Sequence, residues 1–286
     1  MSSLFVIITG ASKGIGRSCA IECMKRSSDI KKLHLCLLAR NVDGLAETSR
    51  LAIASKDNTE SNIEISTHEI DLSDLESLQE KIQLILPSQS TEAETHYDHC
   101  ILINNAGSLG HLGQAKDLPS PMDLQTNIDF NLASSCWLSS YFVRWFHNMN
   151  TNANNANDAN DDSSIANHKK CTVVNMSSLC AVTPFPTMAA YCAGKAYRDM
   201  YHTTMSIEEK NNNNIKILNY APGAVATDMT TSLSECEVLD ADLSDFFKER
   251  DETKFVKVED TSRKLIDLVL AGNFESGKHV DYWDDI

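Results

Sequence analysis

The chain has 286 residues, 42% of them hydrophobic, which is enough for one large α/β domain with an ample core. Its formal net charge of -15 at pH 7 makes nucleic acid and anionic membranes poor partners, because like charges repel.

Short apolar runs alternate with helical patterns along the chain. Strands are predicted at residues 4–9, 33–39, 63–70, 100–104, 171–176, 215–220 and, as a short last one, 279–280. Helical patterns lie between them, for example at 75–86, 124–146 and 189–209. This alternation predicts an α/β fold with a parallel sheet.

The first predicted strand runs directly into a glycine-rich turn, Thr9-Gly10-Ala11-Ser12-Lys13-Gly14-Ile15-Gly16-Arg17, and a helical pattern follows. Strand, glycine turn and helix form the context of a dinucleotide site. Glycines let the backbone approach a pyrophosphate, and the helix N-terminus offers free N–H groups. The spacing is G-x3-G-x-G rather than G-x-G-x-x-G, and a plain glycine-rich turn is the alternative.

The second predicted strand ends in Ala39-Arg40-Asn41. Dehydrogenases that use NAD commonly carry an acidic residue here, which binds the ribose 2′-hydroxyl. The guanidinium of Arg40 instead suits a phosphate, and Lys13 and Arg17 add positive charge. These residues favour NADPH over NADH. Two alternatives stay open: Asp43 serves NADH, or Arg40 merely solvates the strand end.

Residues 148–167 are rich in Asn, Asp, Ala and Ser, so we expect a disordered insertion ahead of the strand at 171–176. A smaller polar loop of the same kind is expected at 211–214. The later stretch 232–257 contains apolar residues that either line a substrate pocket or pack a small helix.

Ser178, Tyr191 and Lys195 are spaced S-x12-Y-x3-K. Tyr191 and Lys195 share one face of a helix. The cation is expected to lower the phenol pKa from about 10 toward working pH, so that the phenol protonates a carbonyl oxygen while a hydride reaches carbon. Ser178 is expected to hold that oxygen. The alternative is that these are ordinary surface residues, because Y-x3-K alone is common.

The motifs together resemble the short-chain dehydrogenase/reductase family over nearly the whole chain. They are T-G-x3-G-x-G at residue 9, Asn104-Asn105-Ala106-Gly107, Ser178, the Tyr191 and Lys195 pair, and Pro222-Gly223. The resemblance implies one domain over residues 1–286, a three-layer, Rossmann-like, doubly wound parallel sheet with the cofactor across the carboxyl ends of the strands. It also implies a homodimer built through the long helices at 124–146 and 189–209.

The resemblance implies a role for several groups of residues. Asn131 would hold a water that relays protons to Lys195. Tyr191 and Lys195 would also contact the nicotinamide ribose. The other cofactor contacts would come from Gly10, Ala11, Ser12, Lys13, Gly14, Ile15 and Gly16 at the pyrophosphate, Arg40 and Asn41 at the 2′-phosphate, Asp71 and Leu72 at the adenine, Asn104, Ala106 and Gly107 at the adenine ribose, and Val225, Ala226, Thr227, Asp228, Met229 and Thr230 over the nicotinamide.

Within the family, the runs at 104–110, 177–181, 191–196, 218–223 and 276–281 resemble members that reduce side-chain carbonyls of a pterin with NADPH, toward tetrahydrobiopterin. That resemblance makes Asp281 the anchor of the pterin ring, because a carboxylate accepts two hydrogen bonds from its 2-amino group and adjacent N–H. The same resemblance implies further substrate contacts from Ser178, Leu179, Tyr191 and Gly223. The alternative for Asp281 is a solvated acid in an acidic tail.

Two other functions stay open: a carbonyl reductase of broader range in the same family, and a sensor or scaffold that binds NADPH without catalysis. No metal site is predicted, because His96 and His99 have no third ligand nearby. The nine cysteines form no C-x-x-C pair and are expected to be reduced thiols of a cytosolic protein. No signal peptide is predicted.

Overall fold

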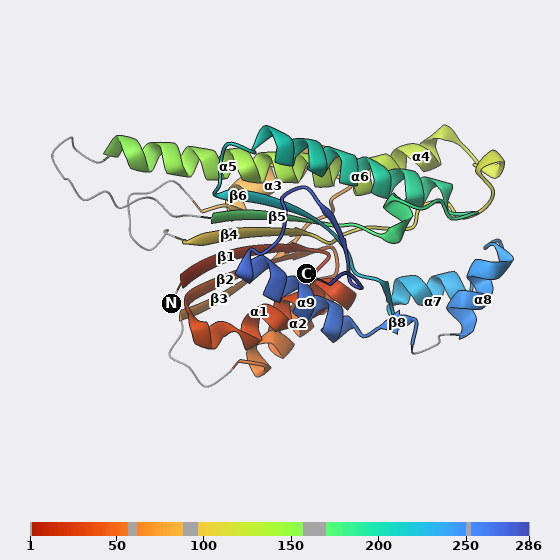
Figure 1. Ribbon diagram of the computed structural model, residues 1–286, viewed down its shortest axis with the longest axis horizontal. Coiled ribbons are helices and arrows are strands. Elements are labelled where there is room, and N and C mark those ends of the chain that lie inside the picture. The colour runs from red at the N-terminus through yellow and green to blue at the C-terminus, as the bar shows by residue number, and fades with distance from the viewer. Residues whose placement is uncertain (1, 57–61, 88–96, 157–169, 250–252, 286) are drawn as a thin grey trace.

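The structure is a computed structural model that describes residues 2–56, 62–87, 97–156, 170–249 and 253–285. A seven-stranded parallel sheet lies between two layers of helices (Figure 1). The strand order is β3-β2-β1-β4-β5-β6-β9, which is a doubly wound arrangement and confirms the predicted fold class. The strands are β1 (Ser2–Thr9), β2 (Ile30–Ala39), β3 (Asn62–Glu69), β4 (His99–Asn104), β5 (Lys170–Met176), β6 (Ile215–Ala221) and β9 (His279–Asp281).

The helices divide between the two faces of the sheet. Figure 1 shows α1 (Gly14–Lys25), α2 (Val42–Ala54) and α9 (Val258–Ala271) on one face. The opposite face is covered by α3 (Leu75–Ile85), α5 (Ser134–Ala156) and α6 (Ala189–Glu208). Within the described residues, no helix has the length and apolar character needed to cross a membrane.

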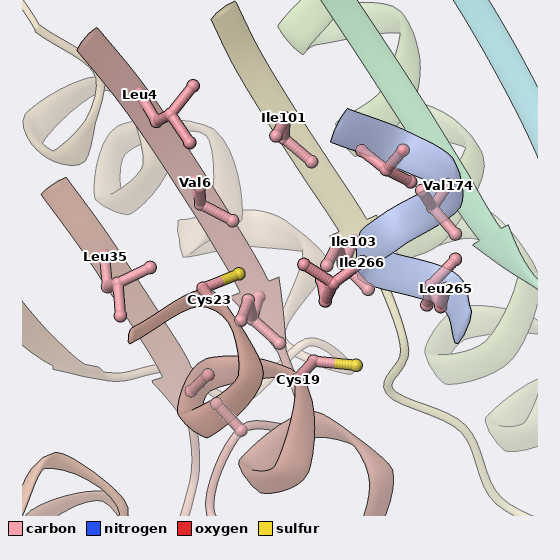
Figure 2. Close-up of a cluster of buried hydrophobic side chains, with 14 of the residues drawn as sticks. Leu4, Val6, Cys19, Cys23, Leu35, Ile101, Ile103, Val174, Leu265 and Ile266 are labelled. Atoms are coloured by element: carbon pink, nitrogen blue, oxygen red, sulfur yellow. The ribbon is translucent and has the colours of Figure 1, made fainter. Parts of the chain in front are cut away.

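Each face of the sheet has its own hydrophobic core. On the α1 and α9 side, strand residues such as Leu4 and Ile101 pack against Cys19 and Ile266 of the helices (Figure 2). On the other side, alternate strand residues such as Phe5 pack against α3, α5 and α6. A strand buried on both faces needs an apolar residue at every position, which explains why the sequence shows continuous apolar runs.

The helical part of the sequence prediction needs one correction. The single helix expected at 124–146 is α4 (Pro121–Asn127), a π-helix (η4, Ile128–Ala133) and α5 in succession. Helical periodicity does not reveal a π-turn, because the wider turn adds one residue without changing residue types. Helix α5 also includes 148–156, the first part of the expected insertion; residues 157–167 lie outside the described residues.

Smaller elements complete the chain. The single-turn helices are η1 (Ser27–Asp29), η3 (Ala115–Asp117) and η5 (Leu179–Ala181). A two-stranded sheet of β7 (Ala224–Val225) and β8 (Phe255–Val256) accompanies α7 (Asp228–Ser234) and α8 (Ala241–Glu249) beyond one end of the main sheet (Figure 1).

In a parallel sheet all carboxyl ends lie at one edge. The segments that follow β1, β2, β4, β5 and β6 contain most of the predicted site residues. The fold therefore brings these sequence-distant segments to the same edge.

Candidate active site

The glycine turn between β1 and α1 is tightly packed. Gly10 and Gly14 have φ angles of +65° and +56°, which side chains rarely adopt. A Cβ atom on Gly16 would lie 2.7 Å from Nδ2 of Asn105 and would collide with the Gly10 carbonyl. Asn105 Nδ2 donates to the Thr9 carbonyl at 2.9 Å. The loop after β4 therefore holds the turn in a form that only glycines permit.

Helix α1 begins in this turn. Lys13 is its N-cap residue and makes no side-chain hydrogen bond to the helix, and no acidic residue stands in the first turn. First-turn N–H groups without a capping side chain bind anions well. The predicted pyrophosphate site at 10–16 thus has a suitable backbone.

The two cations of the turn have different partners. Lys13 Nζ lies 2.6 Å from Oδ2 of Asp228, and both side chains are exposed. This ion pair connects the turn to α7. Arg17 donates to Oγ1 of Thr48 at 3.0 Å and to the carbonyls of Ser12 and Gly44. Arg17 therefore fastens the turn to α2, a structural use that the sequence did not predict.

Arg40 is exposed at the end of β2. Its Nη1 lies 3.9 Å from Oδ2 of Asp71, which brings two predicted adenosine contacts together. Hydrogen bonds from Ser73 hold the pKa of Asp71 below its usual range, so Asp71 is ionised at neutral pH. Asn41 Oδ1 accepts from Gly44 N at 2.7 Å and caps α2. Leu72 is buried in the core, so only its backbone is available to a ligand.

The loop after β4 is held by a buried arginine. Arg198, 1% exposed, donates to the carbonyls of Asn104 at 2.7 Å and Ala106 at 3.1 Å, and to Oδ1 of Asn175 at 2.7 Å. Asn104 Nδ2 in turn donates to Oγ of Ser139 at 2.7 Å, so the Asn104 side chain faces α5. The backbone of 104–107 was expected to form a wall beside the adenine ribose, and that role stays a prediction.

Arg198 was not among the residues predicted from the sequence. It could have been noticed because it follows Lys195 by three residues, which places both side chains on one face of α6. A charge on the same face as a predicted catalytic lysine needs partners when that face is buried. The partners, two backbone carbonyls and a side-chain amide, were not visible in the sequence.

Ser178, Tyr191 and Lys195 come together beside the carboxyl end of β5. Ser178 begins η5, and Tyr191 and Lys195 lie one turn apart on α6. Lys195 Nζ lies 5.5 Å from the centre of the Tyr191 ring and donates to the Met176 carbonyl at 2.5 Å. The Ser178 hydroxyl accepts from Cys180 N at 3.2 Å and is close enough to the Tyr191 phenol to lower its pKa slightly.

The direction of one expected pKa shift is wrong. Burial raises the pKa of Tyr191 above its ordinary value of 10.0, aided by Cys180, and the opposing effects of Arg198 and Ser178 are smaller. Burial and the charge of Arg198 lower the pKa of Lys195 to about 7. At neutral pH the Tyr191 phenol therefore keeps its proton, whereas Lys195 is present both as the ammonium and as the neutral amine.

Asn131 lies in the π-helix η4 and faces the loop after β4. Its Oδ1 accepts from the Ser108 backbone N at 2.8 Å, and its Nδ2 donates to the Ser108 carbonyl and hydroxyl at 3.2 Å. The side chain is thus committed to this loop. A π-turn inside a helix is frequent at functional sites, and the water relay expected of Asn131 stays a prediction.

The segment 225–230 extends from the glycine turn to the phenol. A Cβ atom on Gly14 would lie 3.6 Å from Cγ2 of Thr227, and Tyr191 Oη lies 4.0 Å from Sδ of Met229. Thr227 and Thr230 form a capping box that starts α7, and Thr230 Oγ1 also donates to the Val225 carbonyl at 2.9 Å. Ala226 lies between β7 and this cap. The segment therefore lies beside both the glycine turn and the phenol, and its contact with the nicotinamide stays a prediction.

Asp281 ends β9 at the same edge of the sheet. It pairs with Ala221 of β6, and its Oδ1 accepts from Trp283 N at 3.0 Å. Gly223, with φ +78°, lies next to the Trp283 indole. Because β5, β6 and β9 are adjacent, two strand spacings, about 10 Å, separate the ends of β5 and β9. Leu179, half-exposed, follows Ser178 on η5.

Comparison with known proteins gives a consistent picture. The family model described as short chain dehydrogenase matches residues 4–237. The sepiapterin reductase of Bos taurus is 30% identical over 281 residues, 98% of this chain and 94% of that protein. The benzil reductase ((S)-benzoin forming) of Bacillus subtilis (strain 168) is 25% identical over 96% of each chain. The crystal structure of the KRED1-Pglu enzyme superposes with a TM-score of 0.72, at 19% identity, over 98% of this chain and all of that one.

Replacing Arg198 by Leu is expected to lower the free energy of unfolding by about 3 kcal/mol, because two buried carbonyls and the Asn175 amide lose their donor. Arg263→Leu, on the exposed face of α9, is the matched control and should cost less than about 0.5 kcal/mol. Urea denaturation measures both. Equal stabilities for the two variants would contradict the role given to Arg198.

Proposed function

The chain belongs to the short chain dehydrogenase family, and from this premise we propose that it is an NADPH-dependent sepiapterin reductase. The family makes the protein an oxidoreductase. The proposal adds that its substrates are the side-chain carbonyls of sepiapterin and of 6-pyruvoyl-tetrahydropterin. The observation that carries it is the convergence of Ser178, Tyr191 and Lys195 at the sheet edge where Asp281 also lies.

The residues present fit a dinucleotide. The glycine turn permits close approach of a pyrophosphate, and the first turn of α1 has no capping side chain. Arg40 is exposed where the adenosine end of the cofactor is expected, and its guanidinium can form a bidentate pair of hydrogen bonds with a 2′-phosphate. Asp71 competes for this guanidinium from 3.9 Å, a separation at which the exposed pair is weak.

The chain's own side chains then perform the proton chemistry. Ser178 and the protonated Tyr191 hydrogen-bond to the substrate carbonyl oxygen. NADPH supplies the hydride that reaches the carbonyl carbon. Tyr191 gives its proton to the oxygen as negative charge develops there, and Lys195 returns a proton to the phenolate. The pKa of Lys195, about 7, suits this transfer at neutral pH.

Substrate choice is assigned to Asp281. A pterin places its 2-amino and adjacent N–H groups at one end and its side-chain carbonyl at the other, so that Asp281 would bind one end while Ser178 and Tyr191 bind the other. A carboxylate accepts both N–H groups, and a ketone without them leaves it unpaired at a cost in affinity. The similarity to the bovine sepiapterin reductase supports this assignment.

A broader carbonyl reductase is the second candidate. The Bacillus subtilis relative, at 25% identity, is named for benzil, an aromatic diketone without a pterin ring. Asp281 and the run at 178–180 favour the pterin over this candidate. The intact Ser178, Tyr191 and Lys195 speak against an NADPH-binding sensor.

Assembly and compartment complete the proposal. Exposed Tyr197, Met200 and Ile207 on α6 support a homodimer built through α5 and α6. All nine cysteines are free thiols, which supports the expected cytosolic location.

The proposal predicts NADPH consumption that depends on sepiapterin. Tyr191→Phe should reduce this turnover by about 100-fold or more, because the proton donor is lost, while NADPH still binds. Tyr197→Phe, on the exposed side of the same helix, is the control and should keep wild-type rates. Absorbance at 340 nm and cofactor fluorescence give the two readouts. Undiminished turnover in Tyr191→Phe would refute the acid role.

Arg40→Ala should weaken NADPH binding by about tenfold or more and leave NADH nearly unchanged, because only NADPH carries the phosphate that the guanidinium contacts. Arg50→Ala, an exposed arginine of α2 paired with Glu47, is the control. Titration calorimetry with both cofactors measures the effect. A loss of the same size for both cofactors would remove the case for a phosphate contact.

The pH profile should follow Lys195. Its pKa is lowered to about 7, so the ammonium is present below that pH and is lost as pH rises through it. The kcat/KM for NADPH, which reports ionisations of the free enzyme, should therefore fall as pH rises above about 7. Initial rates between pH 5.5 and 9 test this, and a flat profile above pH 7 would contradict it.

A further inference from the structure

Strand β9 is poorly secured by its backbone alone. It has three residues, lies at an edge of the sheet, and pairs only with β6 within the described residues. Short edge strands with few backbone hydrogen bonds open readily. Yet Asp281, its last residue, must be held in place if it is to fix a rigid ring.

An ion pair fastens the start of this strand to α6. His279 Nδ1 donates to Oδ2 of Asp199 at 2.6 Å, and the side chains are 24% and 12% exposed. The other carboxylate oxygen, Oδ1, accepts from Nδ2 of Asn175 at 2.9 Å. The same amide reaches Oδ1 of Asn219 at 3.0 Å. Asp199 is thus satisfied from β5 and β9 at once, and its position is well defined.

Asp199 lies one turn after Lys195 on α6, on the same helix face. Its charge acts on the Lys195 ammonium and raises the pKa of that group against burial. The ion pair therefore joins the helix that carries Tyr191 and Lys195 to the strand that carries Asp281.

The other side of the strand is fastened independently. Lys264 of α9 donates to the carbonyls of Tyr282 at 2.7 Å and Asp284 at 2.5 Å. Asp281 is thus flanked by two fastened residues. His279, two residues before it, is bound to α6, and Tyr282, directly after it, is bound to α9. This arrangement defines the distance between the anchor and the catalytic helix.

The charged groups that act on His279 are Asp199 from α6 and Asp281 and Asp284 from its own segment, and the Ser177 hydroxyl faces it from the end of β5. The hydrogen bond to Asp199 raises the pKa of His279 above its ordinary 6.5. The imidazolium is therefore fully present below pH 6.5, and the ion pair is lost as pH rises through the raised pKa. Neutral imidazole still donates from Nδ1, so the bond weakens without disappearing.

We infer that His279 and Asp199 are positioning residues that hold Asp281 at the correct distance from Tyr191, so that their ion pair sets the affinity for the pterin ring and neither residue exchanges a proton with the substrate. This inference rests on the proposed function, because it takes Asp281 as the pterin anchor. A carbonyl substrate without the pterin ring does not use Asp281 and should be indifferent to the pair.

The test compares two substrates, sepiapterin and 2,3-butanedione, in the full-length protein. His279→Ala should raise KM for sepiapterin about tenfold with kcat unchanged, because a charge-assisted hydrogen bond is lost. Butanedione kinetics should not change. In the wild type, the KM for sepiapterin should rise as pH increases through the raised pKa of His279, because the ion pair is lost. His279→Asn, whose amide places a donor near the position of Nδ1 and does not titrate, should recover most of the affinity and show no such rise. His147→Ala breaks a similar pair with Glu209 at the far end of α6 and is the control.

An unchanged sepiapterin KM in His279→Ala would overturn the inference. So would an equal loss for both substrates, because general damage to the fold lowers both. The proposed function is tested separately, by sepiapterin turnover in the wild type and by its KM in Asp281→Ala. If the wild type reduces butanedione and not sepiapterin, the proposed function fails, and with it the role in pterin affinity. Hydrogen exchange of the amides at 279–282 then tests the fastening itself: faster exchange in His279→Ala supports it, and unchanged exchange overturns it.

Discussion

A buried guanidinium holds the candidate site together. Arg198 has almost no contact with solvent, and a charge in that position requires several hydrogen-bond acceptors. The acceptors are carbonyls of the loop after β4 and the side chain of Asn175 in β5. Because the buried guanidinium needs these hydrogen bonds, it holds both the loop and Asn175 in one conformation. The same charge lowers the pKa of Lys195 and opposes the rise in the pKa of Tyr191.

One face of α6 contacts three different parts of the molecule. Tyr191 and Lys195 face the expected reaction centre, Arg198 holds the loop after β4, and Asp199 binds His279 of β9. These positions follow the helical repeat, because residues four, seven and eight apart share a face. A single helix thereby relates the proposed proton donor, the loop after β4 and the proposed substrate anchor to one another.

Much of this was predictable from the sequence. Parallel strands covered on both faces need continuous apolar runs, so the strands were found to within a few residues, although β2 begins three residues before the predicted start. The glycine spacing and the order of Ser178, Tyr191 and Lys195 sufficed to place the chain in its family. Residues 124–146 are helical as expected, but the π-turn at 128–133 was not predicted, because it depends on hydrogen-bond register rather than on residue type.

The sequence by itself determined the α/β fold, the glycine turn and the identity of the residues expected to react, since these depend on local patterns and short spacings. Only the tertiary structure decided the pKa directions at Tyr191 and Lys195, because desolvation depends on everything that packs around a group. It alone revealed the contacts of Arg198 and the pairing of Asp199 with His279, because those partners lie 94 and 80 residues apart along the chain and meet only when the sheet has formed.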